Sequence, residues 1–282
     1  MAEGGLAAAA LARSGVSGVA LSLRSDFPIG AGLGGSSAAG VAAVGALAAW
    51  AGESRDRAEL AERSRRIEVE DLGVAGGRQD HYAAAFGGAL ALTFGESTQV
   101  RRILLSPATA EALARQCIVV YSGQSRISGD TITAVLDAYR ARERTVTSSL
   151  ARMRTLAEHM ASALDRGALD ELGGLIGEHW ECQRSLHRAI ATDRIDAIVE
   201  GARSAGAYGA KALGASGGGC VLVVAPADRA SAIRSRLGGL GTLVPFAVDT
   251  DGIRTLSDQR LGAHADARVG DAASSVERAA GA

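Results

Sequence analysis

A glycine-rich loop between an expected strand and an expected helix constrains this chain more than any other feature. The loop, PIGAGLGGSSAA at 28–39, contains four glycines and two adjacent serines. Before it, Val19, Leu21 and Leu23 alternate with Ala, Ser and Arg, which predicts a half-buried strand over 18–25. After it, an Ala/Val/Leu run predicts a buried helix over 38–50 that ends near Gly52.

This order of elements favours anion binding. The first N–H groups of a helix have no internal acceptor, and the helix dipole attracts negative charge to that end. Glycines let the backbone approach a ligand closely, and two serine hydroxyls can bind phosphate oxygens or a hard cation such as Mg²⁺. The alternative is a structural turn in which Ser36 is the helix N-cap.

A second glycine-rich loop, KALGASGGGC at 211–220, leads into an expected buried strand at 220–225. Two such loops can bring two backbone nests to one anion, although glycine-rich turns also precede strands for purely structural reasons. Lys211 is the only lysine in the chain. It is either a contact to a ligand phosphate or a surface charge.

Two carboxylates between the loops suit phosphoryl transfer, which needs a phosphate cradle, a metal and a carboxylate near the attacking hydroxyl. Asp80 lies in GGRQDHYAAAFGG, where its alternative role is N-cap of a helix over 81–86. Glu68 lies on an expected charged helix over 56–72, where its alternative role is a solvated face. His81, beside Asp80, is interpreted as incidental rather than as a ligand or base.

The remaining pattern predicts an α+β protein in two layers, because strands and helices are interspersed without strict alternation. Pro245 suggests that the last strand is an edge strand. Helical pattern over 130–187 is expected to break near Gly167 and Gly173, and residues 257–282 read as a disordered tail. Further strands are expected at 89–94, 117–121 and 243–248, and further helices at 193–205 and after Pro226.

Charge and composition exclude some partners. The net charge is −1 and the basic residues are scattered, which argues against nucleic acid. No apolar run is long enough to cross a membrane and no leader pattern is present, so a cytoplasmic protein is expected. The cysteines, which are three in number and unevenly spaced, are expected to be reduced.

The two loops resemble the phosphate-loop and C-terminal glycine motifs of the GHMP kinases, the superfamily of galactokinase, homoserine kinase, mevalonate kinase and phosphomevalonate kinase. The resemblance covers roughly 15–255 and implies a GHMP kinase fold. Residues 1–100 would form a half like ribosomal protein S5 domain 2, and residues 101–256 a ferredoxin-like half. It implies ATP as co-substrate, Mg²⁺ on Ser37 and Glu68, and Asp80 as the catalytic base. ATP would contact Gly30, Gly32, Leu33, Gly34, Gly35, Ser36, Ser37 and Ala38.

Three segments, GGRQDHYAAAFGG, VVYSGQSRISG and EHWECQRSL, are similar to the heptose 7-phosphate kinases. The substrate implied is D-glycero-D-manno-heptose 7-phosphate, phosphorylated at its anomeric hydroxyl. Arg126 and Arg184 would contact the distal phosphate, and Gly217 and Gly218 would line the substrate site. A basic residue is common in that subfamily where Gln183 stands.

Other functions stay open. Fucokinase-like sugar 1-kinases share much of the pattern, and a truncated, non-catalytic protein that binds nucleotide or sugar phosphate is a second alternative. A dinucleotide-binding oxidoreductase is a weaker one, because no acidic residue follows at the end of a second strand. Whether the chain forms a homodimer is also open.

The superfamily's N-terminal motif, a strand that lines the sugar pocket, should precede residue 15 by several dozen residues. Met1 stands only 27 residues before Pro28. The resemblance therefore implies that the first strands are missing and that the strand at 18–25 has an unpaired edge. We expect weak or no kinase activity, poor solubility and at most residual ATP binding from such a chain.

Overall fold

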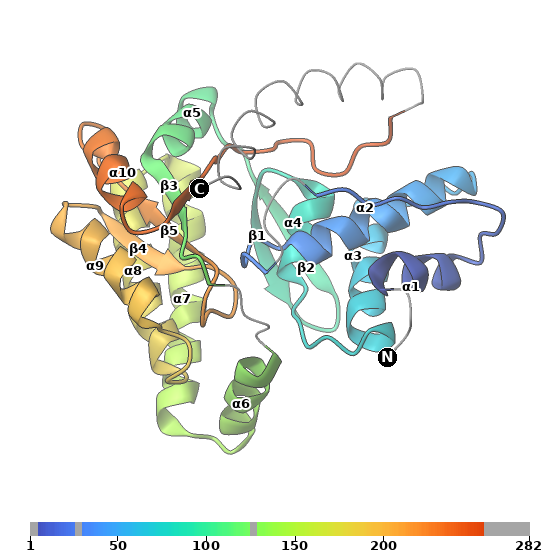
Figure 1. The fold of residues 1–282 in the computed structure, drawn as a ribbon, viewed down its shortest axis with the longest axis horizontal. Helices are drawn as coiled ribbons and strands as arrows, with labels where there is room; N and C mark the ends of the chain where they lie inside the picture. Colours follow the sequence, from blue (N-terminus) through green and yellow to red (C-terminus); the bar gives the residue numbers. More distant parts are fainter. Residues whose placement is uncertain (1–4, 26–29, 125–128, 257–282) are drawn as a thin grey trace, which may run out of the picture.

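The computed structural model describes residues 5–25, 30–124 and 129–256 (Figure 1). The predictions made for Pro28, Arg126 and the tail at 257–282 lie outside the described residues. In the view of Figure 1 the N-terminal half lies to the right and the C-terminal half to the left.

The N-terminal half is a small group of helices beside one hairpin. The charged helix expected over 56–72 begins with a capping box on Asp56 and widens into a π-helix, η1, at Ile67. The elements of the N-terminal half are α1 (Gly5–Ser14), α2 (Gly35–Trp50), α3 (Arg57–Arg66), η1 (Ile67–Asp71), α4 (Gln79–Phe86), β1 (Ala89–Phe94) and β2 (Thr98–Ile103). The predicted helix at 38–50 and the predicted strand at 89–94 are confirmed.

The expected strand over 18–25 is only half right. Val19, Leu21 and Leu23 are partly buried against the cluster formed by α1 and α2, while the residues between them are exposed. The side chains therefore alternate as predicted. The backbone, however, joins no sheet within the described part of the chain. Alternation reports which side chains are buried, whereas a strand also requires a neighbouring backbone.

The C-terminal half is built on a four-stranded antiparallel sheet in the order β4-β5-β3-β6. The first strand of this half, β3, pairs with β5 so that Val119 stands opposite Leu222. The strands are β3 (Cys117–Tyr121), β4 (Gly209–Ala212), β5 (Cys220–Val224) and β6 (Thr242–Val244). The helices are α5 (Pro107–Gln116), α6 (Gly129–Arg140), α7 (Arg144–Arg166), α8 (Leu169–Ser185), α9 (Asp193–Ser204) and α10 (Ala230–Gly238).

Helices cover both faces of this sheet, which explains why CIVVY and CVLVV are apolar at every position. Ile118, Val120, Val221 and Val223 pack in the cluster that includes α9 and α10. Cys117 and Val224 pack with residues of α5, α7 and α8. Successive residues of each strand point to opposite faces of the sheet, so an uninterrupted apolar run supplies core residues to both faces.

Some predicted boundaries hold, and others are wrong. Helix α7 ends at Gly167, which has φ 68° as a left-handed C-cap. Gly173, by contrast, lies inside α8 and does not end a helix. Glycine is needed at this position because a Cβ would collide with Tyr208 beside β4. Strand β6 is an edge strand, as Pro245 suggested, but it spans only Thr242–Val244 and not the predicted 243–248, because Pro245 has no N–H with which to continue the pairing. The α+β class is confirmed. The pattern did not predict β2, β4 or α5, and the expected domain boundary at 100 falls inside β2.

Candidate active site

The first glycine-rich loop forms a left-handed backbone path into α2. Gly30, Gly32 and Gly34 have φ of 75°, 74° and 70°, a region that favours glycine. Gly34 is the N-cap of α2, and no side chain caps the helix. The alternative role of Ser36 as N-cap is therefore wrong. The first N–H groups of α2 face the loop without an intrahelical acceptor, as an anion site requires.

The two glycine-rich loops touch each other. The N–H of Cys220 donates to the carbonyl of Ala31 at 2.8 Å. A Cβ on Gly32 would stand 3.2 Å from the carbonyl oxygen of Leu213, and one on Gly219 would stand 2.7 Å from that of Ala31. The glycines are thus required by the contact between the loops, and Ala31 and Cys220, which are 189 residues apart in the sequence, border one site.

Part of the second loop is committed to the fold. The N–H of Gly217 donates to the carbonyl of Ile190 at 2.8 Å, and that of Gly219 donates to the carbonyl of Gln124 at 2.7 Å. Among the described residues, no backbone carbonyl accepts from Gly218. Ser216 adopts φ 70°, and its hydroxyl donates to the carbonyl of Ile190 at 2.6 Å. Gly218 is therefore the better candidate of the two predicted glycines for a ligand contact.

Glu68 is the centre of a polar cluster at the start of α2. Its Oε1 accepts from Ser36 Oγ at 2.6 Å, and its Oε2 lies 3.3 Å from Ser37 Oγ and 2.8 Å from His81 Nε2. The hydrogen bond from His81 and those from the two serines hold the pKa of Glu68 below its usual range, against the opposing effect of burial. Glu68 does not lie on a solvated face, so that alternative is wrong.

The position of Glu68 depends on the π-helix. The N–H of Leu72 donates to the carbonyl of Ile67 at 3.0 Å, five residues back, and the N–H of Val74 donates to the carbonyl of Glu68 at 3.0 Å. Such wide turns are often found at functional sites. Ile67 is buried in the core, which fixes the turn from which Glu68 extends.

The side chain of Asp80 packs against the first glycine-rich loop. It is the second residue of α4, whose N-cap is Arg78, so Asp80 does not cap that helix. A Cβ on Gly34 would lie 3.0 Å from Asp80 Cβ and 3.2 Å from its Cγ. Desolvation by the surrounding protein raises the pKa of Asp80, and the negative charge of Glu68 acts in the same direction. The carboxyl predicted as the base therefore lies against the loop predicted to hold phosphate.

The donors present suit Mg²⁺. A carboxylate from Glu68 and a hydroxyl from Ser37 are hard oxygen ligands, and Mg²⁺ in phosphoryl-transfer sites commonly takes one or two protein ligands beside substrate phosphates. No group of three or more His, Cys, Asp or Glu side chains within the described ranges could hold a metal by itself. The set thus fits a metal that arrives with a nucleotide.

Of the two arginines predicted to contact the sugar phosphate, Arg184 has partners within the protein and Arg126 lies outside the described residues. Arg184 forms an ion pair with Asp196 at 3.1 Å, and its guanidinium lies 6.0 Å from the centre of the Trp180 ring. To bind a phosphate, Arg184 would have to exchange that carboxylate. Its contact with the substrate stays a prediction, as does that of Arg126.

Sequence reasoning undervalued two residues. His81 is 1% exposed and bonded to Glu68, whereas it was interpreted as incidental. Lys211 is partly buried on β4, where desolvation lowers its pKa to about 8, so it is not an ordinary surface charge. Both residues are recognisable in the sequence, as the histidine of GGRQDHY and the lysine of GAKALGA. The sequence does not show which side chains surround them, and these neighbours distinguish them from an incidental histidine and a surface lysine.

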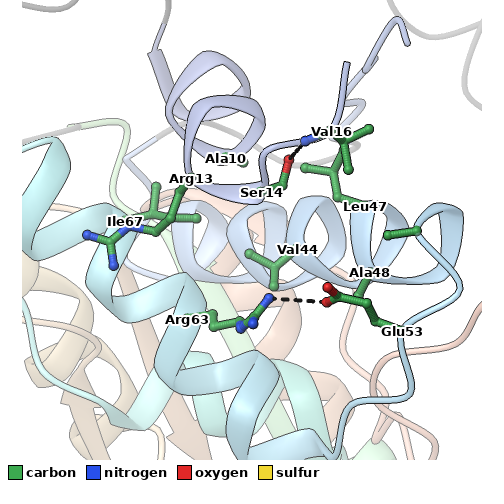
Figure 2. A pocket seen from close by; sticks show the side chains of 11 residues that line it. Ala10, Arg13, Ser14, Val16, Val44, Leu47, Ala48, Glu53, Arg63 and Ile67 are labelled. Carbon is green, nitrogen blue, oxygen red and sulfur yellow. Dashed lines mark hydrogen bonds and ion pairs between the residues drawn. The ribbon is translucent and has the colours of Figure 1, made fainter. Parts of the chain in front are cut away.

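A cavity of about 140 Å³ lies between α1, α2 and α3, away from this cluster (Figure 2). Figure 2 shows Val44, Leu47 and Ala48 on one wall, with Arg63 and Glu53 paired at 3.5 Å at its edge. Val44 lies seven residues beyond Ser37 on α2, which is roughly 10 Å along the helix axis. None of the predicted site residues lines this cavity.

Comparison with known proteins shows the family of the chain. Residues 4–88 match the N-terminal domain of GHMP kinases, and residues 160–241 match their C-terminal domain. The chain belongs to the GHMP kinase family. A mevalonate kinase of Pyrococcus abyssi is 30% identical over 84% of this chain and 68% of its own length.

Two further GHMP kinase relatives concern heptose phosphates. D-glycero-alpha-D-manno-heptose 7-phosphate kinase of Campylobacter jejuni is 28% identical over 82% of this chain and 68% of that protein. The crystal structure of a D-glycero-D-manno-heptose 1-phosphate kinase from Bacteriodes thetaiotaomicron has a TM-score of 0.63 and 25% identity, and the match covers 82% of this chain and 66% of that one. The chain thus spans about two thirds of the length of these relatives.

In the described part of the chain, no helix has both the length and the apolar character needed to cross a membrane.

Proposed function

We propose that this GHMP kinase transfers the γ-phosphoryl group of ATP to the anomeric hydroxyl of a heptose 7-phosphate. The substrate would be D-glycero-D-manno-heptose 7-phosphate and the product the 1,7-bisphosphate. One observation carries the kinase activity: Asp80 packs on Gly34 of the phosphate loop while Ser36 and Ser37 reach Glu68 at the start of the same helix. The three segments similar to heptose 7-phosphate kinases, and the relatives of that name, support the sugar.

The residues would divide the work as follows. The N–H groups at the start of α2 and the left-handed glycines bind the phosphates of ATP. Ser37 and Glu68 would hold Mg²⁺, which supplies charge neutralisation on the transferred phosphoryl group. Asp80 takes the proton from the anomeric hydroxyl, whose oxygen forms the new bond to the γ-phosphorus as the bond to ADP breaks. Its raised pKa makes it a stronger base than an ordinary aspartate.

Two other functions from the sequence analysis serve as outcomes of the tests. A fucokinase-like enzyme would phosphorylate an unphosphorylated sugar at the same position. A non-catalytic protein would bind ATP or the sugar phosphate without turnover.

The first test separates catalysis from binding. Asp80→Asn should lower kcat by about two to four orders of magnitude, while the affinity for ATP measured by calorimetry stays near that of the wild type. Asp170→Asn, in the exposed first turn of α8, is the matched control. A normal rate in Asp80→Asn would refute its assignment as the base. No turnover in the wild-type chain with any sugar, together with retained ATP binding, would favour the non-catalytic protein.

The second test concerns the sugar. ADP release should be faster with the heptose 7-phosphate than with fucose, galactose or mevalonate. Arg126→Ala should raise the KM for the phosphorylated sugar with little change in kcat, since it removes ground-state binding. Equal activity on the unphosphorylated heptose would refute the 7-phosphate assignment and favour the general sugar 1-kinase.

A further inference from the structure

The imidazole of His81 is buried and both of its nitrogens are occupied. The side chain is 1% exposed. Nε2 lies 2.8 Å from Glu68 Oε2 and 3.4 Å from Ser37 Oγ, and Nδ1 lies 2.9 Å from Ser64 Oγ. A buried ring with a defined partner on each nitrogen has one orientation, so whatever it contacts is held in place.

Ser64 is the partner of Nδ1, and its hydroxyl also lies 3.5 Å from the carbonyl oxygen of Ser37. When the hydroxyl of Ser64 donates to Nδ1, a neutral ring carries its single proton on Nε2, where it is donated to Glu68. Ser64 is itself 1% exposed on α3. Its hydroxyl stands where a side chain on Gly40 of α2 would otherwise lie, since a Cβ there would overlap Ser64 Oγ. The space for this serine is therefore provided by a glycine on the helix that carries the phosphate loop.

The network leaves the two carboxylate oxygens of Glu68 unequal. Oε2 accepts from His81 Nε2 at 2.8 Å on the side of the protein interior, and it also lies 3.3 Å from Ser37 Oγ. Oε1 accepts from the hydroxyl of Ser36, an exposed residue in the first turn of α2. The carboxylate is thus anchored through one oxygen and presents the other at the surface next to the loop.

We propose that His81 is a positioning residue that fixes the Glu68 carboxylate through the Nε2–Oε2 hydrogen bond, so that this carboxylate is preorganised for a nucleotide-bound cation. This role rests on the proposed function, in which Glu68 is a metal ligand. Partners that orient a metal ligand from behind commonly change metal affinity ten- to hundredfold when removed. His81 adjoins Asp80 in the chain, so the first turn of α4 positions the carboxylate for the metal and supplies the carboxylate for the sugar hydroxyl.

The test measures metal binding directly, with Mn²⁺ as the probe in the presence of a non-hydrolysable ATP analogue. Free Mn²⁺ is followed by electron paramagnetic resonance with the full chain. His81→Leu removes the donor and should weaken Mn²⁺ binding by about tenfold or more. His81→Gln can place an amide N–H near the position of Nε2, and it should restore most of the affinity. His159→Leu, at an exposed site on α7, is the matched control and should bind like the wild type.

The outcomes separate positioning from simple packing. Rescue by His81→Gln but not by His81→Leu supports the proposal. Equal Mn²⁺ affinity of the His81→Leu variant and the wild type would overturn it. The proposal would also be overturned if both His81 variants lost the same Mn²⁺ affinity and that loss paralleled the decrease in their thermal midpoints. If His81→Leu does not fold, Ser64→Ala takes its place. That variant must lower Mn²⁺ affinity, or the proposal is overturned. A wild-type chain that binds no Mn²⁺ with the analogue would overturn the proposed function and, with it, this role.

Discussion

Replacing Lys211 with methionine should make the chain more stable at neutral pH and less dependent on pH above 8. Lys211 is the only lysine of the chain and lies on β4, where desolvation lowers its pKa from 10.5 to about 8. Among the described residues, no carboxylate forms an ion pair with it. The nearby titratable group is His179 on α8, whose pKa is lowered to about 4, first by its own burial and then by Lys211.

The sign follows from the protons bound in each state. Between pH 8 and 10.5 the unfolded chain keeps the lysine proton while the folded chain has lost it, so stability rises with pH by about 1.4 kcal/mol per unit from this group. Below pH 8 the folded chain bears the full penalty, which is on the order of 3 kcal/mol. Lys211→Met removes that penalty while keeping an unbranched side chain.

The assay is urea unfolding of both proteins from pH 7 to pH 10. The advantage of Lys211→Met should be largest at pH 7 and should shrink above pH 8. Cys117 and Cys220, whose pKa burial raises to about 11, lower stability above pH 9 in both proteins and so cancel in the difference. Arg140→Met, at an exposed ion pair on α6, is the control and should show no such trend. A difference that stays constant across this range would refute the argument that Lys211 is desolvated.

Four other outcomes are expected. Gly34→Ala should destabilise the chain by about 1–2 kcal/mol in urea unfolding, because φ 70° disfavours alanine. It should also lower kcat, because the new Cβ would press on Asp80. Ser216→Gly should leave unfolding free energy nearly unchanged, since relief of φ 70° offsets the lost hydroxyl bond, whereas Ser216→Ala should lose about 1 kcal/mol, and equal effects would contradict this. A thiol reagent should label Cys182 in the native chain but not the two buried cysteines, and labelling of all three without unfolding would be inconsistent with the core described. Amide exchange should be fast at 19–24 and slow in β3 and β5, and protection at 19–24 would reveal a backbone partner for that segment.

The sequence alone predicted the parts of this GHMP kinase that depend on neighbouring residues. Gly30, Gly32 and Gly34 mark a left-handed path into a helix, and the apolar run after them predicts that helix, because both follow from local backbone preferences. The two carboxylates were identified by residue type and by their place between the loops. The apolar runs at 117–121 and 220–225 likewise predicted buried strands.

The tertiary structure decided what those residues contact. Whether Ser36 caps a helix or reaches Glu68 depends on α3 and η1 lying beside α2, and residue spacing does not report that arrangement. The alternation at 19–23 predicted buried side chains correctly, but a strand needs a second backbone that the pattern does not specify. His81 differs from an incidental histidine only because Ser64 and Glu68, from a neighbouring helix and the π-turn that follows it, occupy its two nitrogens. Burial and hydrogen-bond partners are properties of packed elements, so they become visible only when the chain is folded.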